Sequence, residues 1–331
     1  MKPQSGARRA LIGTVWLSGS GYIGFVLNLG VTLVLARILF PKDFGQFALA
    51  GSFVDLLSII TAFSFSQGII QMPTAPQVAE TAYVLSRRLY WGMLAVAAVL
   101  CVILSPHYPG SFIPLFFILF AVRNLTLFSY VYSAQLEKQL VYHQLSVVRL
   151  VTAVLAMVVA LAMARAGAGV WSLLGREVVL SGAALVGNRV ASRWRYHGGY
   201  NHETAQRLWR FGWQMFVTRG LETLWYRADT ALLGILGGTI VLGFYDRGRY
   251  LAEFGHYVVS FGAVQVAYPV YARLQGRAEA VAYAYRLTHG FLVRLMFPVL
   301  IWLLLFPREL VGLLYGAGQR WDETAAILPW L

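Results

Sequence analysis

Nine apolar stretches, most of them about 20 residues or longer, follow one another along the chain between short polar segments. An α-helix rises 1.5 Å per residue, so about 20 apolar residues cross the hydrocarbon core of a bilayer. The alternation that barrel strands require is absent, which favours helices. The predicted spans are 10–38, 44–71, 83–105, 111–133, 145–165, 168–188, 208–236, 240–271 and 287–306, and a tenth begins near Ala325. This pattern predicts an all-α, polytopic membrane protein.

Composition supports this prediction. Of the 331 residues, 58% are hydrophobic and only 12% are charged, against roughly 25% charged residues in globular domains. The net charge of +13 is better explained by topology and by anionic membrane lipids than by nucleic acid, which we do not expect as a partner. Cys101 is the only cysteine, and no HExxH-like spacing occurs. We therefore expect no disulfide, metal site or cofactor.

The basic residues predict an orientation. If the N-terminus is cytoplasmic, 15 of the 27 Lys and Arg residues fall in cytoplasmic segments and 5 in the opposite loops, as the positive-inside rule requires. The first stretch is too long for a signal peptide and is interpreted as an uncleaved span. The longest polar connection, Arg189–Arg207, marks the best domain boundary. The predicted domains are a six-helix bundle (1–190), a cytoplasmic basic linker (191–207) and a partial second bundle (208–331).

The two bundles resemble one another in sequence. An ungapped shift of 198 residues aligns identical residues across three spans; the pairs are Thr32 and Thr230, Leu35 and Leu233, Gly45 and Gly243, Phe63 and Phe261, Gln67 and Gln265, Arg88 and Arg286, Leu89 and Leu287, and Gly92 and Gly290. Six spans is an even number, so both copies cross the membrane in the same sense, which is one of the repeat symmetries of transporters. A complete second copy would extend beyond Leu331, so the sequence is interpreted as a C-terminally truncated form of a longer carrier.

The seventh and eighth spans carry an unusual number of charges. Each Asp, Lys or Arg near the bilayer centre costs about 2.5–3.5 kcal/mol on insertion scales. Arg219, Glu222, Tyr226 and Asp229 follow helical spacing and share one face. We expect that face to look into protein or into a watery cavity, where function would reside.

Three motifs resemble the Wzx-type polysaccharide flippases of the multidrug/oligosaccharidyl-lipid/polysaccharide (MOP) exporter superfamily. They are the turn from Ala36 to Phe47, the pair of segments 229–234 and 242–247, and Leu313–Gly316 with Trp321. The resemblance implies a MATE-like fold of two pseudo-symmetric helical bundles around a central cavity, here with the second bundle incomplete.

The same resemblance implies a function. It is the flipping of undecaprenyl-pyrophosphate-linked oligosaccharide units, for O-antigen of lipopolysaccharide, capsule or exopolysaccharide, across the bacterial inner membrane by alternating access. A lipid-linked oligosaccharide would be the substrate, and polysaccharide polymerase or export machinery would be possible partners. The protein would then be a transporter and not an enzyme.

Arginine suits a pyrophosphate because its planar group stays charged and binds phosphate in a bidentate manner. The candidate substrate-binding residues are Arg219, Arg294, Arg123, Arg249 and Arg227. The alternative is that these arginines form structural ion pairs, since Glu222 follows Arg219 by three residues and Glu253 follows Arg249 by four. Candidates for proton or sodium coupling are Glu222, Asp229, Glu253 and His256, which could equally be partners of the arginines.

Three other functions stay open. A cation-coupled small-molecule or multidrug antiporter of the same superfamily would need an acidic cavity, against which the intramembrane arginines argue. A membrane-embedded polyprenyl-glycan enzyme would need a large extramembrane loop with catalytic acids, and no loop exceeds about 20 residues. A non-catalytic membrane scaffold is the third.

Overall fold

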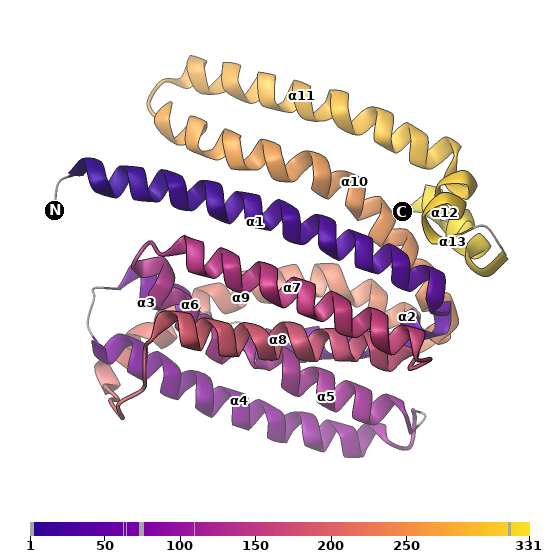
Figure 1. Cartoon of the computed structure of the whole chain (residues 1–331), viewed down its shortest axis with the longest axis horizontal. Coiled ribbons are helices and arrows are strands. Elements are labelled where there is room, and N and C mark those ends of the chain that lie inside the picture. Colours follow the sequence, from indigo (N-terminus) through magenta and orange to yellow (C-terminus); the bar gives the residue numbers. More distant parts are fainter. Residues whose placement is uncertain (1–2, 62, 64, 73–75, 109, 317–318) are drawn as a thin grey trace. The chain divides into compact units, whose positions relative to one another are not determined.

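The structure is a computed structural model that describes residues 3–61, 63, 65–72, 76–108, 110–316 and 319–331. Within helices, side chains are not described for residues 3–12, 14, 15, 17, 18, 76, 254–266, 268, 269, 272 and 319. All regular elements of the described chain are helices (Figure 1). The fold is therefore all-α, as predicted from the sequence.

The helices follow one another with short connections. In order they are α1 (Pro3–Ile38), α2 (Pro41–Leu57), the 3₁₀ helix η1 (Ser58–Thr61), α3 (Phe65–Gln71), α4 (Pro76–Leu104), α5 (Phe112–Asn124), α6 (Thr126–Lys138), α7 (Tyr142–Arg165), α8 (Val170–Ser192), α9 (His202–Leu236), α10 (Gly238–Arg273), α11 (Ala278–Leu305), α12 (Pro307–Tyr315), η2 (Gln319–Trp321), α13 (Asp322–Ile327) and η3 (Leu328–Trp330).

Seven helical stretches of the described chain are long and apolar enough to cross a membrane; they are Gly19–Ile38, Pro41–Thr61, Gln77–Leu104, Phe112–Lys138, Tyr142–Arg165, Val170–Ser192 and Ala278–Leu305. They correspond to seven of the nine predicted spans. Several large apolar side chains on them face outward, including Val102 at 73% exposure and Leu305 at 61%. Such surfaces suit lipid and not water.

The remaining two predicted spans, 208–236 and 240–271, lie in α9 and α10. Both helices are long enough to span a bilayer, at 35 and 36 residues. Five charged residues interrupt α9 between positions 208 and 236. For this reason α9 is not one of the seven stretches that are apolar enough to cross a membrane by composition. In α10, the side chains of 254–266 lie outside the described part of the structure.

The chain divides into two compact units. Unit 1 comprises Met1–Leu39 and Gln46–Gly237, and unit 2 comprises Phe40–Gly45 and Gly238–Leu331. In unit 1, α7 packs against both α1 and α8 (Figure 1), and α4 packs against α5 and α6. Ala156, Ala160 and Ala164 are buried and recur every four residues along α7. Small residues at this spacing allow neighbouring helices to approach closely.

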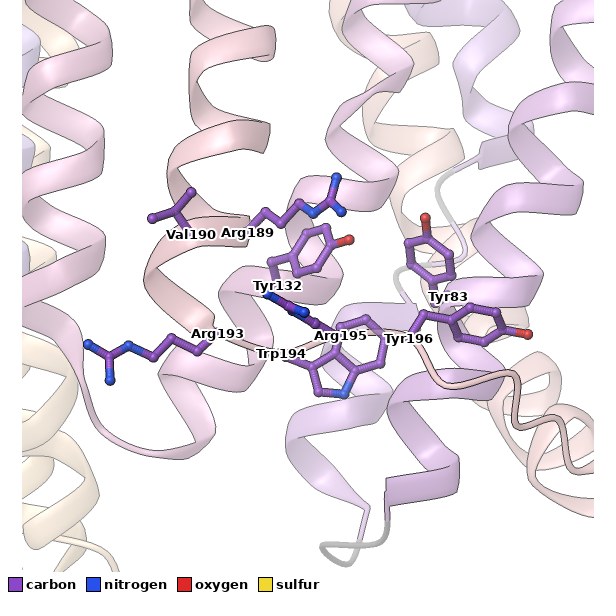
Figure 2. Close-up of a pocket in the computed structure, with 8 residues that line it drawn as sticks. All are labelled: Tyr83, Tyr132, Arg189, Val190, Arg193, Trp194, Arg195 and Tyr196. Carbon is purple, nitrogen blue, oxygen red and sulfur yellow. The ribbon is translucent and has the colours of Figure 1, made fainter.

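The segment between α8 and α9 is fixed to α4. The ring of Tyr196 stacks on Tyr83 with 5.2 Å between centroids, and Figure 2 shows Trp194 in the same ring cluster. The backbone N–H of Asn201 donates to Thr81 Oγ1 at 3.1 Å. A Cβ added to Gly199 would lie 1.7 Å from Glu80 Oε2, so the segment approaches the Glu80 side chain of α4 closely at this point. The predicted basic linker is thus an ordered part of unit 1.

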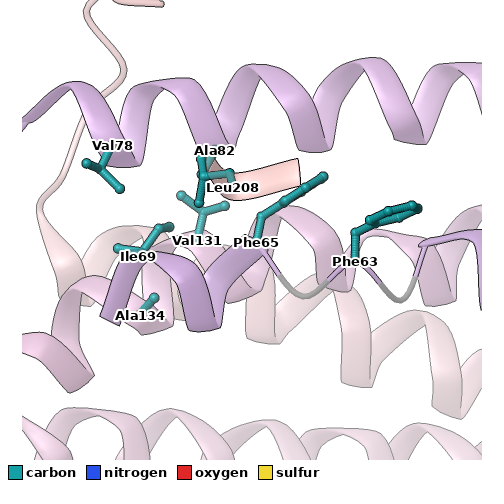
Figure 3. Close-up of a cluster of buried hydrophobic side chains, with 8 residues drawn as sticks. All are labelled: Phe63, Phe65, Ile69, Val78, Ala82, Val131, Ala134 and Leu208. Atoms are coloured by element: carbon teal, nitrogen blue, oxygen red, sulfur yellow. The ribbon is translucent and has the colours of Figure 1, made fainter. Parts of the chain in front are cut away.

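The beginning of α9 also belongs to unit 1. Leu208 is fully buried in a cluster with residues of α3, α4 and α6 and with Phe63 (Figure 3). The ring of Phe63 stacks on Trp209 with 4.3 Å between centroids. This packing places the boundary between the compact units at Gly237, whereas the sequence placed the domain boundary at 191–207. The predicted division into two repeats is a separate question and stays a prediction.

In unit 2, the first turn of α2 meets the first turn of α10. A Cβ added to Gly45 would lie 1.6 Å from the carbonyl oxygen of Thr239, and one added to Gly243 would lie 1.9 Å from that of Pro41. Helix α2 begins with Pro41 at its first helical position, and the N–H of Phe40 donates to Asp43 Oδ2 at 3.0 Å. These are normal features of a helix start.

The core of unit 2 is an aromatic cluster around Trp321, which is 1% exposed. Its ring lies 5.8 Å from Phe44, 6.3 Å from Phe244 and 5.3 Å from Tyr315, measured between centroids. The guanidinium of Arg247 lies 4.3 Å from the Phe44 ring centroid, and Tyr315 donates to the carbonyl oxygen of Arg247 at 3.1 Å. Burial raises the pKa of the Tyr315 phenol far above its ordinary value, so this donor keeps its proton. Residues from the turn Ala36–Phe47, from segment 242–247 and from the last motif therefore meet in one packed cluster.

Candidate functional site

A network of ionised side chains centres on Asp55 of α2, inside unit 1. Asp55 Oδ1 accepts from Arg123 Nη1 of α5 at 2.8 Å, and Asp55 Oδ2 pairs with Arg227 Nε of α9 at 2.8 Å. One carboxylate therefore binds two arginines from two other helices. Asp55 and Arg123 lie within stretches that can cross a membrane, where unpaired charge is costly and partnered charge is the rule.

The network continues to α8 and α1. Arg123 Nε donates to Glu177 Oε2 at 3.4 Å, and Arg176 lies 3.9 Å from the other oxygen of Glu177. Arg176 also donates to the side-chain oxygen of Asn28. The Arg123 guanidinium further lies 5.8 Å from the Phe47 ring centroid. Five helices thus contribute polar groups, and the donors of Arg123 are directed at carboxylates.

An open groove of about 470 Å³ borders this network. Its wall consists of Asp55, Ser58 and Ile59 on one side and of residues of α9 on the other; the α9 residues are Arg219, Glu222, Thr223, Tyr226 and Arg227. Arg219, Glu222 and Tyr226 are members of the helix face predicted from the sequence. That face looks into a groove of unit 1 that is half polar and accessible to a ligand.

The ion pairs at this site join more arginines than carboxylates. The ion pairs of the network join three arginines (Arg123, Arg176 and Arg227) to two carboxylates (Asp55 and Glu177). Arg219 and Glu222 neutralise one another at 3.0 Å. These pairs hold three guanidinium groups against two carboxylates beside a half-polar groove, an arrangement that favours an anion over a cation.

Arg227 is the arginine best placed to bind a ligand. Its side chain is 43% exposed in the groove, and its bond to Asp55 uses Nε. Within the described residues, its two Nη groups, which carry four of the five guanidinium donors, have no partner. These donors have the planar geometry that binds phosphate oxygens in a bidentate manner.

Arg249, Glu253 and Arg294 belong to unit 2. There Arg249 pairs with Glu253 at 2.7 Å on α10, as the alternative of structural pairing anticipates. Arg294 lies exposed on α11. Asp229 of α9 accepts a bond from the N–H of Thr230 at 2.6 Å. The side chain of His256 lies outside the described residues. Within unit 1, the structure brings Arg123, Arg219, Arg227 and Glu222 together with Asp55.

Sequence reasoning did not select Asp55 or Glu177 as site residues. A signal for Asp55 existed, because it is the only charged residue of the predicted span 44–71, and a lone carboxylate in a span implies a partner. Glu177 had no comparable signal, since the adjacent Arg176 offered a local partner. Within the described residues, no group of three or more His, Cys, Asp or Glu side chains is arranged to hold a metal ion.

Together these features define a multi-pass helical membrane protein with an open, arginine-lined groove built on partly buried ion pairs. The chain belongs to the polysaccharide biosynthesis protein family, whose profile matches residues 34–326. This finding agrees with the resemblance drawn from the sequence motifs.

Two relatives describe the similarity further. The chain is 23% identical over 339 aligned residues to the succinoglycan biosynthesis transport protein ExoT of Rhizobium meliloti (strain 1021). This alignment covers 99% of the chain and 66% of ExoT. The chain thus spans about two thirds of the relative's length. A solved structure of the lipid II flippase MurJ, in an inward closed conformation, matches 95% of this chain and 71% of its own, with a TM-score of 0.70 and 10% identity. This match shows a shared fold.

Proposed function

We propose that this protein is a flippase for lipid-linked oligosaccharides and that it moves a polyprenyl-pyrophosphate-linked glycan across the bacterial inner membrane. Family membership supports a role in polysaccharide biosynthesis, and the name of its relative ExoT describes a transport protein. The observation that carries the proposal is the groove beside Asp55, where Arg227 is exposed and the bond to Asp55 leaves its Nη donors available. In this proposal the lipid that carries the glycan is undecaprenyl pyrophosphate, and the N-terminus of the protein lies in the cytoplasm.

The groove suits the chemistry of such a substrate. A pyrophosphate must be neutralised while its lipid tail stays in hydrocarbon, and Arg227 can approach it through Nη1 and Nη2 without releasing Asp55. Arg123 has a different role in this proposal. Its contacts with Asp55 and Glu177 hold the carboxylate that orients Arg227, so it acts as a positioning residue. Arg219 can join the ligand by releasing Glu222, since both side chains are about half exposed.

The antiporter alternative receives less support from the site. A cation carrier needs a carboxylate that is open to its ion. In the described residues, Asp55 is bound by two arginines, Glu222 by Arg219, and Glu253 by Arg249. Coupling through Glu222, Asp229, Glu253 or His256 is retained only as an accompanying hypothesis, because alternating transport of a charged lipid needs an energy source.

A flipping assay tests the proposal. The purified chain is reconstituted in liposomes that contain a fluorescent polyprenyl pyrophosphate carrying N-acetylglucosamine, and dithionite destroys the fluorophores exposed on the outer leaflet. We expect wild-type protein to make the inner-leaflet pool accessible. Arg227→Ala should lower the rate at least tenfold, because one guanidinium contact to phosphate is removed. Arg227→Lys should be intermediate, because it keeps the charge and loses the planar donor pair.

The matched control is Arg207→Ala. Arg207 lies on the same helix and pairs with Glu203, but both side chains are about 70% exposed and neither lines the groove. A fluorescent phosphatidylcholine controls for non-selective scrambling. Wild-type rates in Arg227→Ala, or equal losses in Arg227→Ala and Arg207→Ala, would contradict the assignment of the groove. Equal flipping of phosphatidylcholine would contradict the assignment of the substrate.

A further inference from the structure

A second polar hollow lies in unit 1, at the end of α8 and away from the residues that form the groove. It is an open pocket of about 840 Å³ whose lining is half polar. Four aromatic rings form its wall, from Tyr83, Tyr132, Trp194 and Tyr196, and the lining also includes three arginines, of which Arg189 and Arg195 lie beside the rings (Figure 2). The arginines come from the last turn of α8 and from the segment that follows it.

The aromatic wall is held in place by mutual contacts. Trp194 lies 5.7 Å from Tyr132 and 5.9 Å from Tyr83, both measured between ring centroids. Tyr196 stacks on Tyr83, and the segment that carries both Trp194 and Tyr196 is anchored to α4 through Thr81. The rings are therefore preorganised, which lowers the entropy lost when a ligand binds. Aromatic faces in this arrangement can pack against the apolar C–H faces of a sugar ring.

The arginines of the pocket have no acidic partner. Arg189, Arg193 and Arg195 are exposed, and none forms an ion pair with a described residue. The nearest carboxylate of the segment, Glu80, lies 3.6 Å from His197. Arg193 also has φ of +53°, a left-handed conformation that glycine or asparagine usually adopts at the end of a helix. Three arginines therefore line the pocket without an ion pair to the described chain, and Figure 2 shows that the side chain of Arg193 points away from the rings.

The pocket lies near the ends of three candidate membrane spans. It is bordered by three stretches that can cross a membrane, and it touches each near its end. Tyr83 is six residues from the start of Gln77–Leu104, Tyr132 is six residues from the end of Phe112–Lys138, and Arg189 is three residues from the end of Val170–Ser192. At 1.5 Å per residue, these positions are within about 9 Å of the span ends. A bilayer crossed by these three stretches would therefore have its headgroup layer near the pocket.

We propose that this pocket binds the phosphorylated sugar headgroup of a membrane-anchored glycolipid, as a surface site separate from the transport groove. Arginines match the phosphoryl oxygens, the aromatic wall matches the sugar, and the depth matches a headgroup whose tail stays in the bilayer. An anionic phospholipid offers the phosphate but no sugar ring. The proposal rests on the proposed function for the identity of the lipid carrier, and on the pocket alone for the phosphate and the sugar.

Binding to the full chain in phosphatidylcholine nanodiscs tests the site. The probes are a fluorescent polyprenyl pyrophosphate carrying N-acetylglucosamine and the same lipid without the sugar, with phosphatidylglycerol as competitor. We expect the triple variant Arg189→Gln, Arg193→Gln and Arg195→Gln to bind both probes at least tenfold more weakly. Trp194→Leu should remove the preference for the sugar-bearing probe, so that both probes bind alike.

The matched control reduces the charge equally elsewhere. Arg273, Arg277 and Arg286 are exposed arginines of unit 2 around the turn between α10 and α11, and their triple Gln variant should bind both probes as wild type does. The proposal is overturned if the pocket variant binds like wild type, or if the control variant loses as much affinity. It is also overturned if wild type shows no preference for the sugar-bearing probe and phosphatidylglycerol displaces it fully, because the pocket is then a phospholipid site.

The flipping assay separates this inference from the proposed function. The pocket variants should flip the labelled lipid at the wild-type rate when it is abundant. They should flip it more slowly when it is scarce, because a surface site raises the rate at which the protein captures the lipid from the membrane. Arg227→Ala should lose flipping while it retains binding at the pocket. Binding without flipping in wild type would contradict the proposed function alone, and flipping without a binding difference in the pocket variant would contradict the inference alone.

Discussion

Gly45 and Gly243 make reciprocal contacts: each lies against the backbone of the other's helix, where no side chain fits. Gly45 approaches the carbonyl oxygen of Thr239, and Gly243 approaches that of Pro41. The same shift of 198 residues that aligns the two glycines also aligns Pro41 with Thr239. Each glycine thus contacts the residue that the shift pairs with the other glycine's contact: Gly45 meets Thr239, and Gly243 meets Pro41. Such reciprocal contacts are expected at a two-fold axis between two copies. This geometry supports the duplication inferred from sequence.

Alanine at either glycine should therefore destabilise the protein. Gly243→Ala and Gly45→Ala each place a methyl group inside a backbone contact, and such overpacking costs about 1–3 kcal/mol. We expect lower thermal midpoints of both variants in detergent. Gly290→Ala is the control, because a Cβ there meets nothing within 4 Å and alanine favours the helix. A midpoint in Gly243→Ala equal to that of Gly290→Ala would count against the close approach.

Asp55→Asn should destabilise unit 1 and impair flipping. The substitution leaves Arg123 and Arg227 without their shared carboxylate, and breaking a buried ion pair costs about 3–5 kcal/mol. The loss should fall below that range, because Arg227 is 43% exposed and screened by solvent. Thermal stability and the flipping rate measure the effect. Glu203→Gln, which breaks an exposed pair on α9, should change stability by less than about 1 kcal/mol.

Trp321→Ala should unfold unit 2 at lower temperature. The indole is 1% exposed and contacts three aromatic rings, and truncation of a buried aromatic residue costs about 3–5 kcal/mol. Trp330→Ala, at 88% exposure, is the matched control and should leave the thermal midpoint unchanged. Similar midpoints for the two variants would contradict the packed cluster.

The predicted orientation can be read from single cysteines. Cys101, the only native cysteine, is replaced by alanine, and a cysteine is introduced either at His107 or at Arg195. With a cytoplasmic N-terminus, a membrane-impermeant maleimide should label His107→Cys in intact cells and label Arg195→Cys only after permeabilisation. The opposite pattern would place the aromatic and arginine pocket on the outer face.

The local rules of helix formation are strong enough to predict most of the fold from sequence. Long apolar runs specify helices whatever their neighbours, so seven of the predicted spans coincide with strongly apolar helices. The face of α9 that carries Arg219, Glu222 and Tyr226 followed from its periodicity alone. Pairing between helices could not be read in the same way. The partners of Arg123 come from α2 and α8, at separations of 68 and 54 residues, and periodicity says nothing about such distances.

The motifs behind the family resemblance illustrate the same limit. The sequence patterns that contain Phe44, Arg247, Tyr315 and Trp321 could be recognised, but the patterns alone did not indicate what these side chains contact. The structure shows that they pack against one another, so their role in this chain is architectural. The residues that the resemblance made conspicuous are therefore different from those that line the groove.

The assignment of Phe40–Gly45 to unit 2 has a consequence for biosynthesis. These six residues are synthesised early. Their neighbour Gly243 emerges from the ribosome about 200 residues later, and Trp321 emerges later still. A fragment cut between Gly237 and Gly238 would release a C-terminal piece that lacks Phe44 for its aromatic cluster. Unit 2 is therefore not an independent module, because its compact fold includes Phe40–Gly45 from the early part of the chain.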